Sequence, residues 1–294
     1  MKRILITGAT GNIGSEVIRF LYKIETKNKI VAAVRNIEKA QKKIKYYPQL
    51  DFVQFDFENP EKFERAFKNI DCVFLLRPPQ IADVDQYFKP LIVKMKDEGI
   101  NQIVFLSVQG VEKSPIIPHH KIEKLIQESG LNYIFLRPSY FMQNLTTILL
   151  SDIQNKRKII LPAGKAKFNW IDVENIGEAS AILLNDFEQY KNQAVEITGY
   201  ENKNFSEVTV LINQTIEDKI EFVSSNPLRF YNIKKDDGLE TGMILVMIML
   251  HFLPRFQKEP IISDLYEKLT GEKPTSLEEF IERENKKFTS FHNQ

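Results

Sequence analysis

The stretch Ile4-Leu5-Ile6-Thr7-Gly8-Ala9-Thr10-Gly11-Asn12-Ile13-Gly14 decides the fold of this chain. A short apolar run leads directly into three glycines spaced three residues apart, and residues 15–21 continue with helical periodicity. A strand, a glycine turn and a helix N-terminus in immediate succession form a phosphate-binding site. The first glycine permits a tight turn, the second lets backbone N–H groups approach a pyrophosphate, and the third allows close helix–strand packing. We therefore predict a nucleotide cofactor bound by Gly8, Thr10, Gly11, Asn12, Ile13 and Gly14.

The bulk properties narrow the class of protein. The chain has 294 residues, enough for one large domain or for a large and a small one. Its net charge of +1 speaks against electrostatic capture of nucleic acid or of an anionic membrane. A strand that begins by residue 3 leaves no room for a signal or transit peptide, so we expect a cytoplasmic protein. Both a monomer and a homodimer are compatible with the sequence.

Three local features are interpreted as structural. The single cysteine, Cys72, lies in an apolar run and is expected to be a buried strand residue without a disulfide partner. No metal site is predicted, because the pair His119-His120 has no Cys or acid at ligand spacing beside it. The longest apolar stretch, residues 243–250, is far shorter than the ~20 residues of a membrane span, which predicts a core or pocket helix.

Apolar runs of strand length alternate with amphipathic segments of helix length over residues 1–150. This alternation predicts an α/β fold, a doubly wound parallel sheet with helices on both faces, and together with the glycine turn it predicts a Rossmann-type NAD(P)-binding core. Several runs are apolar throughout, as expected for strands buried on both faces. The predicted strands are 3–7, 30–34, 51–54, 72–76, 102–106 and 133–136, and the predicted helices are 15–22, 37–44, 60–67, 83–98 and 121–128.

The second half of the chain is organised differently. Residues 170–199 are predicted to return to the core with a helix at 177–184 and a strand at 194–198, after a loop or short hairpin at 163–167. Residues 200–294 are predicted to form a smaller, mostly helical substrate or lid region, to which part of 145–170 belongs spatially. Helices are expected there at 239–252 and 261–269, and Ser276-Leu277-Glu278-Glu279 predicts a capping box.

The residue that ends the second predicted strand selects between the two nicotinamide cofactors. An Asp or Glu there binds the ribose 2′-hydroxyl, whereas an Arg pairs with a 2′-phosphate. Here Arg35 follows Val34, and no acid appears before Glu38. A guanidinium group suits a phosphate because it donates bidentately. We therefore predict NADP(H), with NAD(H) as the less favoured cofactor.

Two further strand ends are expected to contribute to the cofactor site, because ligands of open α/β sheets bind at the carboxyl ends of the strands. Asp56 and Phe57 follow the third predicted strand and are predicted to lie beside the adenine. Leu76 and Arg77 end the fourth strand and are predicted to line the ribose and phosphate side.

Segments spread over nearly the whole chain resemble the NmrA-like atypical short-chain dehydrogenase/reductases. The more specific of them is Arg137-Pro138-x-x-Phe141-x-x-Asn144 after the preceding Ser129-Gly130-Leu131. The family includes NADPH-dependent quinone reductases, isoflavone-reductase-like enzymes and non-catalytic redox sensors. The other matching segments are Thr7 to Gly14, Val34-Arg35-Asn36, Phe55-Asp56-Phe57, Phe105-Leu106-Ser107 and Thr270-Gly271-Glu272-Lys273-Pro274.

The chain departs from this pattern at the catalytic position. Most catalytic relatives use Tyr-x-x-x-Lys, in which the Tyr donates a proton to the substrate and the Lys lowers the pKa of that Tyr. The segment expected to hold this pair, residues 118–124, contains no Tyr. Tyr231 and Lys235 have the spacing but fall in the C-terminal region, so we interpret them as coincidental.

The resemblance suggests substitutes for the missing pair. Lys121 matches the lysine of the isoflavone-reductase-like enzymes, and Lys124 takes that place under a different register. His119 or His120 is a candidate proton relay, because histidine titrates near neutral pH. Ser107 matches the serine of the superfamily that hydrogen-bonds substrate, although it could instead cap the following loop.

Hydride transfer requires the nicotinamide to be held against an acceptor in a water-poor pocket. Tyr140, Phe141 and Asn144 are predicted to form the substrate side of such a pocket, with Pro138 on the cofactor side. The apolar segment with Met243, Met247 and Met249 either adds flexible surface for a flat substrate or belongs to the ordinary core.

The leading hypothesis is an NADPH-dependent reductase that transfers hydride to a quinone or other conjugated carbonyl, a small apolar or aromatic substrate. The alternative is a non-catalytic NADP(H)-binding redox sensor that acts through a protein partner, which the missing Tyr supports. A nucleotide-sugar epimerase or dehydratase is disfavoured, because that chemistry relies on the absent Tyr.

Overall fold

The structure is a computed structural model that describes residues 1–44, 47 and 49–289. The chain divides into two compact units, each assembled from three stretches of sequence. Unit 1 comprises residues 1–138, 173–197 and 265–272, and unit 2 comprises 139–172, 198–264 and the residues from 273 onward. This division leaves residues 139–150 and 170–172 in unit 2, whereas the sequence-based boundaries group both stretches with the nucleotide-binding core.

Unit 1 contains the predicted parallel sheet. Its seven strands run in the order β10-β6-β5-β4-β1-β2-β3, and every pair of neighbours is parallel. The chain therefore winds from β1 toward β3 on one side and from β4 toward β10 on the other. The strands are β1 (Arg3–Ile6), β2 (Lys29–Val34), β3 (Asp51–Gln54), β4 (Cys72–Leu76), β5 (Gln102–Leu106), β6 (Asn132–Pro138) and β10 (Gln193–Ile197).

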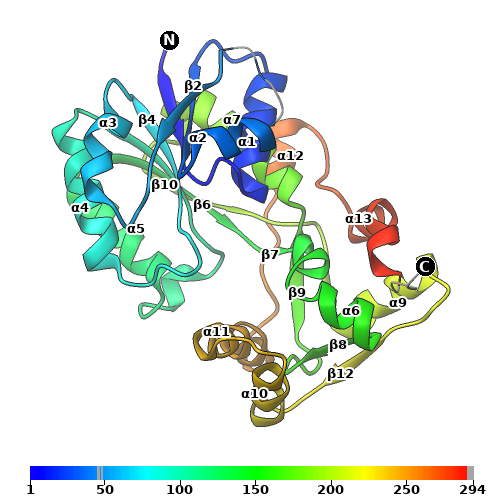
Figure 1. Cartoon of the computed structure of the whole chain (residues 1–294). Helices are drawn as coiled ribbons and strands as arrows, with labels where there is room; N and C mark the ends of the chain where they lie inside the picture. The colour runs from blue at the N-terminus through cyan, green and yellow to red at the C-terminus, as the bar shows by residue number, and fades with distance from the viewer. Residues whose placement is uncertain (45–46, 48, 290–294) are drawn as a thin grey trace. The chain divides into compact units, whose positions relative to one another are not determined.

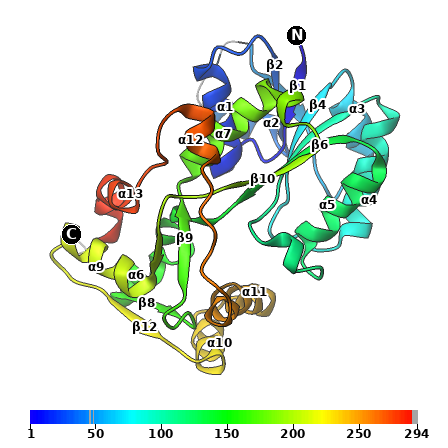
Figure 2. The ribbon, with the colours of Figure 1, turned by 180° about the vertical axis from the view of Figure 1, so that it is seen from behind.

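Helices cover both faces of this sheet, as Figures 1 and 2 show. On one face α1 packs against α7, which in turn contacts β5, β6 and α12, and on the other face α4 packs between α3 and α5. Short 3-10 turns at Pro60–Lys62 and Val111–Lys113 precede α3 and α5. The helices are α1 (Asn12–Lys23), α2 (Ile37–Lys43), α3 (Phe63–Phe67), α4 (Val84–Asp97), α5 (Pro118–Ser129), α7 (Val173–Asn185), α8 (Phe187–Tyr190) and α12 (Leu265–Thr270).

The central strands of unit 1 are buried and mostly apolar because both faces of the sheet are covered. Leu5, Val73 and Phe105 join one core cluster with the buried residues of α3, α4 and α5. Their neighbours along each strand point to the opposite face, where α1 and α7 lie. Cys72 is among these buried strand residues, and burial raises the pKa of its thiol to about 12. The thiol therefore stays protonated at neutral pH.

Residues 200–294 are mostly helical, as the sequence predicts, and unit 2 contains two small sheets in addition. β9 (Lys167–Ile171) lies between β7 (Tyr140–Phe141) and β11 (Asn202–Asn204), and β8 (Lys158–Leu161) pairs with β12 (Glu221–Ser224). These short strands lack the repeating βα rhythm, so no sequence pattern indicated them. The helices are α6 (Leu150–Lys156), α9 (Phe205–Thr215), α10 (Pro227–Asp236), α11 (Thr241–Phe252) and α13 (Leu277–Glu284), with 3-10 turns η3 (Met142–Thr146), η4 (Leu253–Phe256) and η5 (Asn285–Phe288).

Two predictions about the C-terminal part have different outcomes. The capping box is confirmed: the Ser276 side chain accepts from the Glu279 N–H, and the Glu279 carboxylate accepts from the Ser276 N–H. The helix predicted at 261–269 is wrong in its first turn, since α12 begins only at Leu265. Ser263 instead donates its N–H to the Thr198 hydroxyl at 2.8 Å, which holds this segment outside helical geometry. Across the described residues, no helix is both long and apolar enough to traverse a bilayer.

Candidate functional site

The glycine turn after β1 has the geometry that its spacing predicts. Gly8 adopts a positive φ of 61°, which favours glycine, and its carbonyl accepts the Gly11 N–H at 2.8 Å. A Cβ atom on Gly14 would lie 2.3 Å from that same carbonyl oxygen. Any side chain at position 14 would therefore push the turn and the helix apart. The three glycines let the chain reverse and enter α1 within one tight loop.

This turn lies at the point where the strand order of the sheet reverses. β1 is flanked by β2 on one side and β4 on the other, and ligands of open α/β sheets bind in the crevice at such a point. The Thr7 hydroxyl, which the sequence analysis did not single out, donates to the Phe74 carbonyl and accepts from the Leu76 N–H. It thereby fixes the start of the turn to the end of β4.

The first turn of α1 presents backbone N–H groups without a side-chain competitor. Gly11 is the N-cap and has no side chain to accept these donors, and the first turn contains no acidic residue. Ser15, the nearest hydroxyl, donates to the Gly11 carbonyl instead. A helix N-terminus without a side-chain cap favours an anion at its positive dipole end.

The close packing of α1 against α7 depends on a glycine that the sequence analysis overlooked. A Cβ atom on Gly177 would lie 2.5 Å from the Cβ of Glu16. Glycine at this position lets the two helices approach closely, so the N-terminus of α1 is anchored by packing along its length. The sequence signal for this close packing is weak, because a single glycine in an Ala-rich helix can also be a residue that merely lowers the helix propensity.

The predicted adenosine-side residues lie at the carboxyl ends of β2 and β3. Arg35 is exposed, and no ion pair holds its guanidinium within the described part of the chain. Asp56 is half-buried and accepts the Glu58 N–H through one carboxylate oxygen. Phe57 packs its ring against Phe88 in the core, so only its backbone is available to a ligand. The side-chain role of Phe57 is thus structural.

Arg77 organises the loop after β4. Its Nη1 donates to the carbonyls of Pro78, Pro79 and Ile81, the last at 2.7 Å, and its Nε donates to His119 Nε2 at 3.4 Å. Burial lowers the pKa of Arg77, but the guanidinium is charged at neutral pH nonetheless. Most of its donors are used within the protein, which makes it a positioning residue for the loop.

The surroundings of His119 argue against the predicted proton relay. Burial, together with the Arg77 charge, lowers the pKa of His119 to about 3. Its ring lies near Phe105 and accepts from Arg77, so the imidazole is neutral at physiological pH. His120 is turned elsewhere, with Nδ1 3.1 Å from the Val111 carbonyl. With its pKa this low, the His119 ring does not gain a proton near neutral pH, which a relay at that pH requires.

The two candidate lysines differ in their contacts. Lys124 is exposed and lies 3.7 Å from the Glu128 carboxylate. Lys121 is also exposed, and no described residue forms an ion pair with it. Ser107 is only 2% exposed at the end of β5, and its hydroxyl has no hydrogen-bond partner among the described residues. A buried hydroxyl without a partner is costly, so a bound ligand would relieve it. Ser107 does not cap the following loop.

The predicted substrate residues all belong to unit 2, where Tyr140 is committed to the core. Its hydroxyl lies 2.9 Å from His251 Nε2, and its ring meets those of Phe168, Trp170 and Phe205. The Asn144 side chain also hydrogen-bonds the Tyr140 hydroxyl.

Phe141 belongs to the same part of unit 2 as Tyr140. It is half-buried and pairs with Ile171 where β7 meets β9. The contacts of Tyr140 with His251 and with three aromatic rings make Tyr140 a structural anchor of unit 2.

His251 is a fully buried neutral histidine. Nδ1 lies 2.7 Å from the Met247 carbonyl, an acceptor only, so Nδ1 carries the hydrogen and Nε2 accepts from Tyr140. Burial lowers the pKa of His251 to about 4, and burial raises the pKa of Tyr140. The pair is therefore uncharged over the physiological range.

The coincidental Tyr-x-x-x-Lys spacing lies on α10 of unit 2. Tyr231 and Lys235 approach Thr241 Oγ1, each at 3.4 Å, and both residues belong to unit 2, whereas the glycine turn belongs to unit 1. The Tyr-x-x-x-Lys spacing therefore occurs in a different structural unit from the glycine turn.

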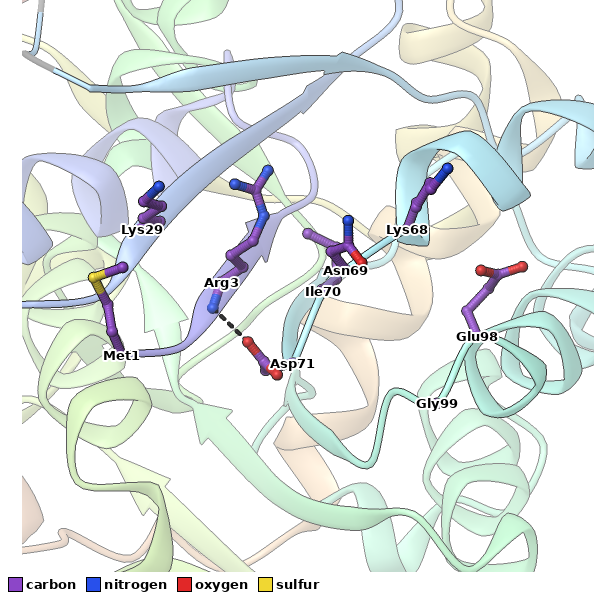
Figure 3. A pocket seen from close by; sticks show the side chains of 9 residues that line it. All are labelled: Met1, Arg3, Lys29, Lys68, Asn69, Ile70, Asp71, Glu98 and Gly99. Atoms are coloured by element: carbon purple, nitrogen blue, oxygen red, sulfur yellow. Dashed lines mark hydrogen bonds between the residues drawn. The ribbon is translucent and has the colours of Figure 1, made fainter.

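A cavity of about 610 Å³ lies at the opposite edge of the sheet from the glycine turn. Figure 3 shows Arg3 and Lys29 at the starts of β1 and β2, with Asp71 accepting the Arg3 N–H at 2.7 Å. Glu98, which also lines it, forms an ion pair with Lys94 at 2.8 Å. Because this cavity lies at the amino ends of the strands, it is separate from the candidate cofactor site.

Sequence comparison assigns the family. The model of the NmrA-like family matches residues 1–281. The chain belongs to the NmrA-like family. It is 28% identical over 277 residues to "Prestalk A differentiation protein A" of Dictyostelium discoideum, covering 94% of this chain and 90% of that protein. It is 27% identical over 283 residues to an NAD(P)H azoreductase of Xenophilus azovorans, covering 94% and 96%.

Solved structures of the same fold include both enzymes and a regulator. The triphenylmethane reductase of Citrobacter sp., complexed with NADP(H), has a TM-score of 0.83 at 21% identity, covering 96% of this chain and 99% of that one. An NADPH-dependent quinone oxidoreductase of Escherichia coli, complexed with NADPH, has a TM-score of 0.82 at 22% identity, covering 95% and 99%. NmrA, a negative transcriptional regulator solved with NADP, has a TM-score of 0.71 at 18% identity, covering 96% and 94%. At these identities the likeness establishes the Rossmann-type fold of this NmrA-like chain.

Proposed function

We propose that this NmrA-like protein binds NADP(H) and reduces a quinone or another conjugated carbonyl compound by hydride transfer. The observation that carries the proposal is the glycine turn at the switch point of the sheet, followed by an uncapped helix N-terminus. Solved structures with this fold that contain NADP(H) support the choice of cofactor. The quinone oxidoreductase and the azoreductase among the relatives support a conjugated acceptor.

The residues at the carboxyl edge of the sheet suit the parts of a dinucleotide. The turn and the first N–H groups of α1 suit a pyrophosphate, because a Cβ at Gly14 would fill the space that keeps them together. Arg35 suits the 2′-phosphate, because its charge has no partner among the residues described. Asp56 and the Phe57 backbone suit the adenine amine, while Leu76 and Pro138 supply apolar surface at the ends of β4 and β6.

Arg35 is the residue that tests the cofactor choice. We expect Arg35→Ala to weaken NADPH binding about 10- to 100-fold, since a charge-assisted hydrogen bond contributes about 1.5–3 kcal/mol. NADH binding should be unchanged. Arg65→Ala removes another exposed arginine from α3 and is the matched control. Titrations of both cofactors by fluorescence would measure this, and equal losses for NADPH and NADH would contradict the assignment.

The chemistry needs little from the protein beyond positioning. Bound NADPH supplies the hydride, and reduction of a quinone to the hydroquinone takes one further proton, which water can provide. The Ser107 hydroxyl is buried and has no partner among the described residues, so it can donate a hydrogen bond to a substrate carbonyl oxygen or to a ribose hydroxyl. Lys121 would hold the nicotinamide ribose, as in the isoflavone-reductase-like pattern, with His119 as neutral packing beside Arg77.

Turnover is tested by following NADPH oxidation by absorbance with a panel of quinones and azo compounds. We expect Lys121→Ala to lower kcat/KM about tenfold or more, whereas Lys124→Ala should leave it unchanged. The two lysines are exposed on the same helix, so each controls for loss of charge in the other. A larger effect at Lys124 would move the role to that residue.

A second candidate function is a sensor that binds NADP(H) without turnover. Two observations favour it: residues 118–124 lack the Tyr, and the His119 imidazole is neutral and bound to Arg77. NmrA, which has this fold, is a regulator. NADPH binding in the micromolar range or tighter, together with no oxidation by any acceptor of the panel, would favour the sensor.

A further inference from the structure

Helix α11 of unit 2 is apolar on two faces. Ile244, Met247 and His251 are buried at positions i, i+3 and i+7 and form the face that packs into the core. A helix on a protein surface ordinarily carries polar residues on its other face. Here the other face consists of the exposed side chains Leu245, Val246, Met249, Leu250 and Leu253.

This second stripe is continuous at helical spacing. Residues 245, 249 and 253 are four apart, as are 246 and 250, so they form one exposed surface along α11 and into η4. Leu245 is 55% exposed and Val246 is 52% exposed. Phe256 extends the surface at the end of η4 and is 73% exposed. Single exposed apolar residues are common, whereas a contiguous patch of this kind marks an interaction surface.

A basic cavity adjoins the end of this stripe. It has a volume of about 520 Å³ and is lined by residues 164–167 from the turn between β8 and β9 and by residues of the segment after α11. Its cations are Lys165, Lys167, Arg255 and Lys258. Lys167 is neutralised by Glu259 at 3.0 Å, but the other three have no ion pair with any residue that the structure describes.

Arg255 connects the apolar and the basic surfaces. It belongs to η4, between Leu253 and Phe256, and its guanidinium lies 5.2 Å from the centre of the Phe252 ring. The main chain at Gly164 lies directly beside this side chain, since a Cβ there would come within 2.7 Å of Arg255 Nε. The guanidinium is therefore held at the border of the stripe.

The cations without an ion pair in the described chain gather at the C-terminal end of α11, whereas acids and lysines are mixed before its N-terminus, where Lys235 Nζ lies 3.4 Å from Thr241 Oγ1. The exposed acids Asp236 and Glu240 precede its N-terminus, and Asp237 is paired with Lys156 at 2.6 Å. The cations lie at the C-terminal end, in η4 and the cavity. Figure 1 shows α10 and α11 side by side in unit 2, so the acids and the cations border one helical layer.

We propose that the α11–η4 stripe and the basic cavity together dock this protein onto a membrane surface that contains anionic phospholipids. Leu253 and Phe256 would insert among the acyl chains, while Lys165, Arg255 and Lys258 contact the phosphate groups. Apolar side chains beside unpaired cations match the two layers of a lipid surface, whereas a purely apolar partner would leave the cations without a counter-charge. The net charge of the whole chain, +1, does not report this local cluster of cations, because acidic residues elsewhere in the chain balance it.

Vesicle sedimentation tests the proposal with the full chain. We expect the protein to sediment with vesicles of phosphatidylcholine and phosphatidylglycerol, and to stay in solution with phosphatidylcholine alone. Raising the salt concentration should release it, because exposed charges are screened. Lys165→Gln with Lys258→Gln should weaken binding about 25-fold, about fivefold for each charge. Lys27→Gln with Lys89→Gln, two exposed lysines of unit 1, should have no effect.

A second pair of variants tests the apolar part. Leu253→Ser with Phe256→Ser should weaken vesicle binding more than about tenfold. Val93→Ser with Ile116→Ser removes two apolar side chains of unit 1 that are comparably exposed and is the control. Circular dichroism confirms that each variant is folded, and the lysine variants test the proposal without touching apolar residues.

Three results would overturn the proposal. The first is that the wild-type protein ignores both kinds of vesicle. The second is that the unit 1 controls lose as much binding as the variants of the stripe. The third is a dimer, measured by light scattering, that Leu253→Ser with Phe256→Ser dissociates, because the stripe would then cover a second copy of the chain.

Discussion

The glycine turn of unit 1 and the Tyr140 cluster of unit 2 show opposite uses of polar groups. Around the turn, the helix N-terminus has no side-chain cap and the buried Ser107 hydroxyl has no partner in the described chain. In the Tyr140 cluster, the hydroxyl is bonded to His251, whose other nitrogen is bonded to the Met247 carbonyl. The first region leaves polar groups for a ligand, whereas the second satisfies its own.

This difference separates binding from stability. A polar group left without a partner in a folded protein weakens the fold until something binds it, so such groups indicate where a ligand belongs. A buried pair that is fully satisfied specifies one packing of the core. Of the residues predicted at the site, Ser107 of unit 1 fits the first description, whereas Tyr140 fits the second.

Gly14→Ala should have the largest effect. The new Cβ would lie 2.3 Å from the Gly8 carbonyl oxygen, so the turn must open and the N–H groups lose their arrangement. We expect NADPH binding to weaken more than about 100-fold, or about 2.7 kcal/mol. Gly242→Ala meets nothing within 4 Å and is the control. Calorimetric titration measures both, and an unchanged affinity in Gly14→Ala would refute the role of the turn.

Tyr140→Phe should act on stability alone. Without the hydroxyl, the buried His251 Nε2 has no donor, which costs about 1–3 kcal/mol in the free energy of unfolding. Urea denaturation followed by circular dichroism measures this change. NADPH affinity should stay the same. If turnover disappears while stability is unchanged, Tyr140 belongs to the substrate site as the sequence predicted.

Acid should destabilise the protein through its two buried neutral histidines. The folded-state pKa values, about 3 for His119 and about 4 for His251, lie below the ordinary value of 6.5. The unfolded chain therefore binds protons that the folded chain does not, and stability present above pH 6.5 is lost as the pH falls toward 4. Between pH 6.5 and 5.5 the loss is about 1 kcal/mol for each histidine.

A series of urea denaturation curves over this pH range would test the effect. In His119→Gln the loss should be about half that of the wild type, because only His251 then contributes. An amide can still accept from Arg77, so the local contacts are retained. The same pH dependence in this variant would exclude His119 as a source.

Tyr231→Phe should have the smallest effect. The hydroxyl lies 3.4 Å from Thr241 Oγ1 at an exposed position, and an exposed substitution of this kind changes stability by less than about 0.5 kcal/mol. Neither NADPH oxidation nor NADPH binding should change. It also serves as the matched control for Tyr140→Phe, and a loss of turnover here would show that its Tyr-x-x-x-Lys spacing is functional.

Much of unit 1 was predictable from the sequence, because its signals are local. The predicted strand at 51–54 has the bounds of β3, those at 72–76 and 102–106 have the bounds of β4 and β5, and α1 follows the glycine turn directly. Strands buried on both faces are apolar throughout, and glycine spacing reports the turn without reference to distant residues.

Unit 2 was harder to predict because its contacts join distant parts of the chain. Residues 140–141 form a strand only because residues 170–171 lie beside them, and a two-residue strand leaves no period in the sequence. The first turn of the helix predicted at 261–269 is lost to the contact of Ser263 with Thr198. Propensity is a weak guide where such tertiary contacts decide.

The sequence by itself determined the parallel sheet, the glycine turn and the arginine at the end of β2, since each depends on residues near one another in the chain. The tertiary structure decided which polar groups are free. His119 carries no charge because it is buried and because Arg77, 42 residues earlier, lies beside it, and Tyr140 is bonded to His251, 111 residues later. The free energy of a buried polar group depends on its partners, and only the folded chain brings those partners together.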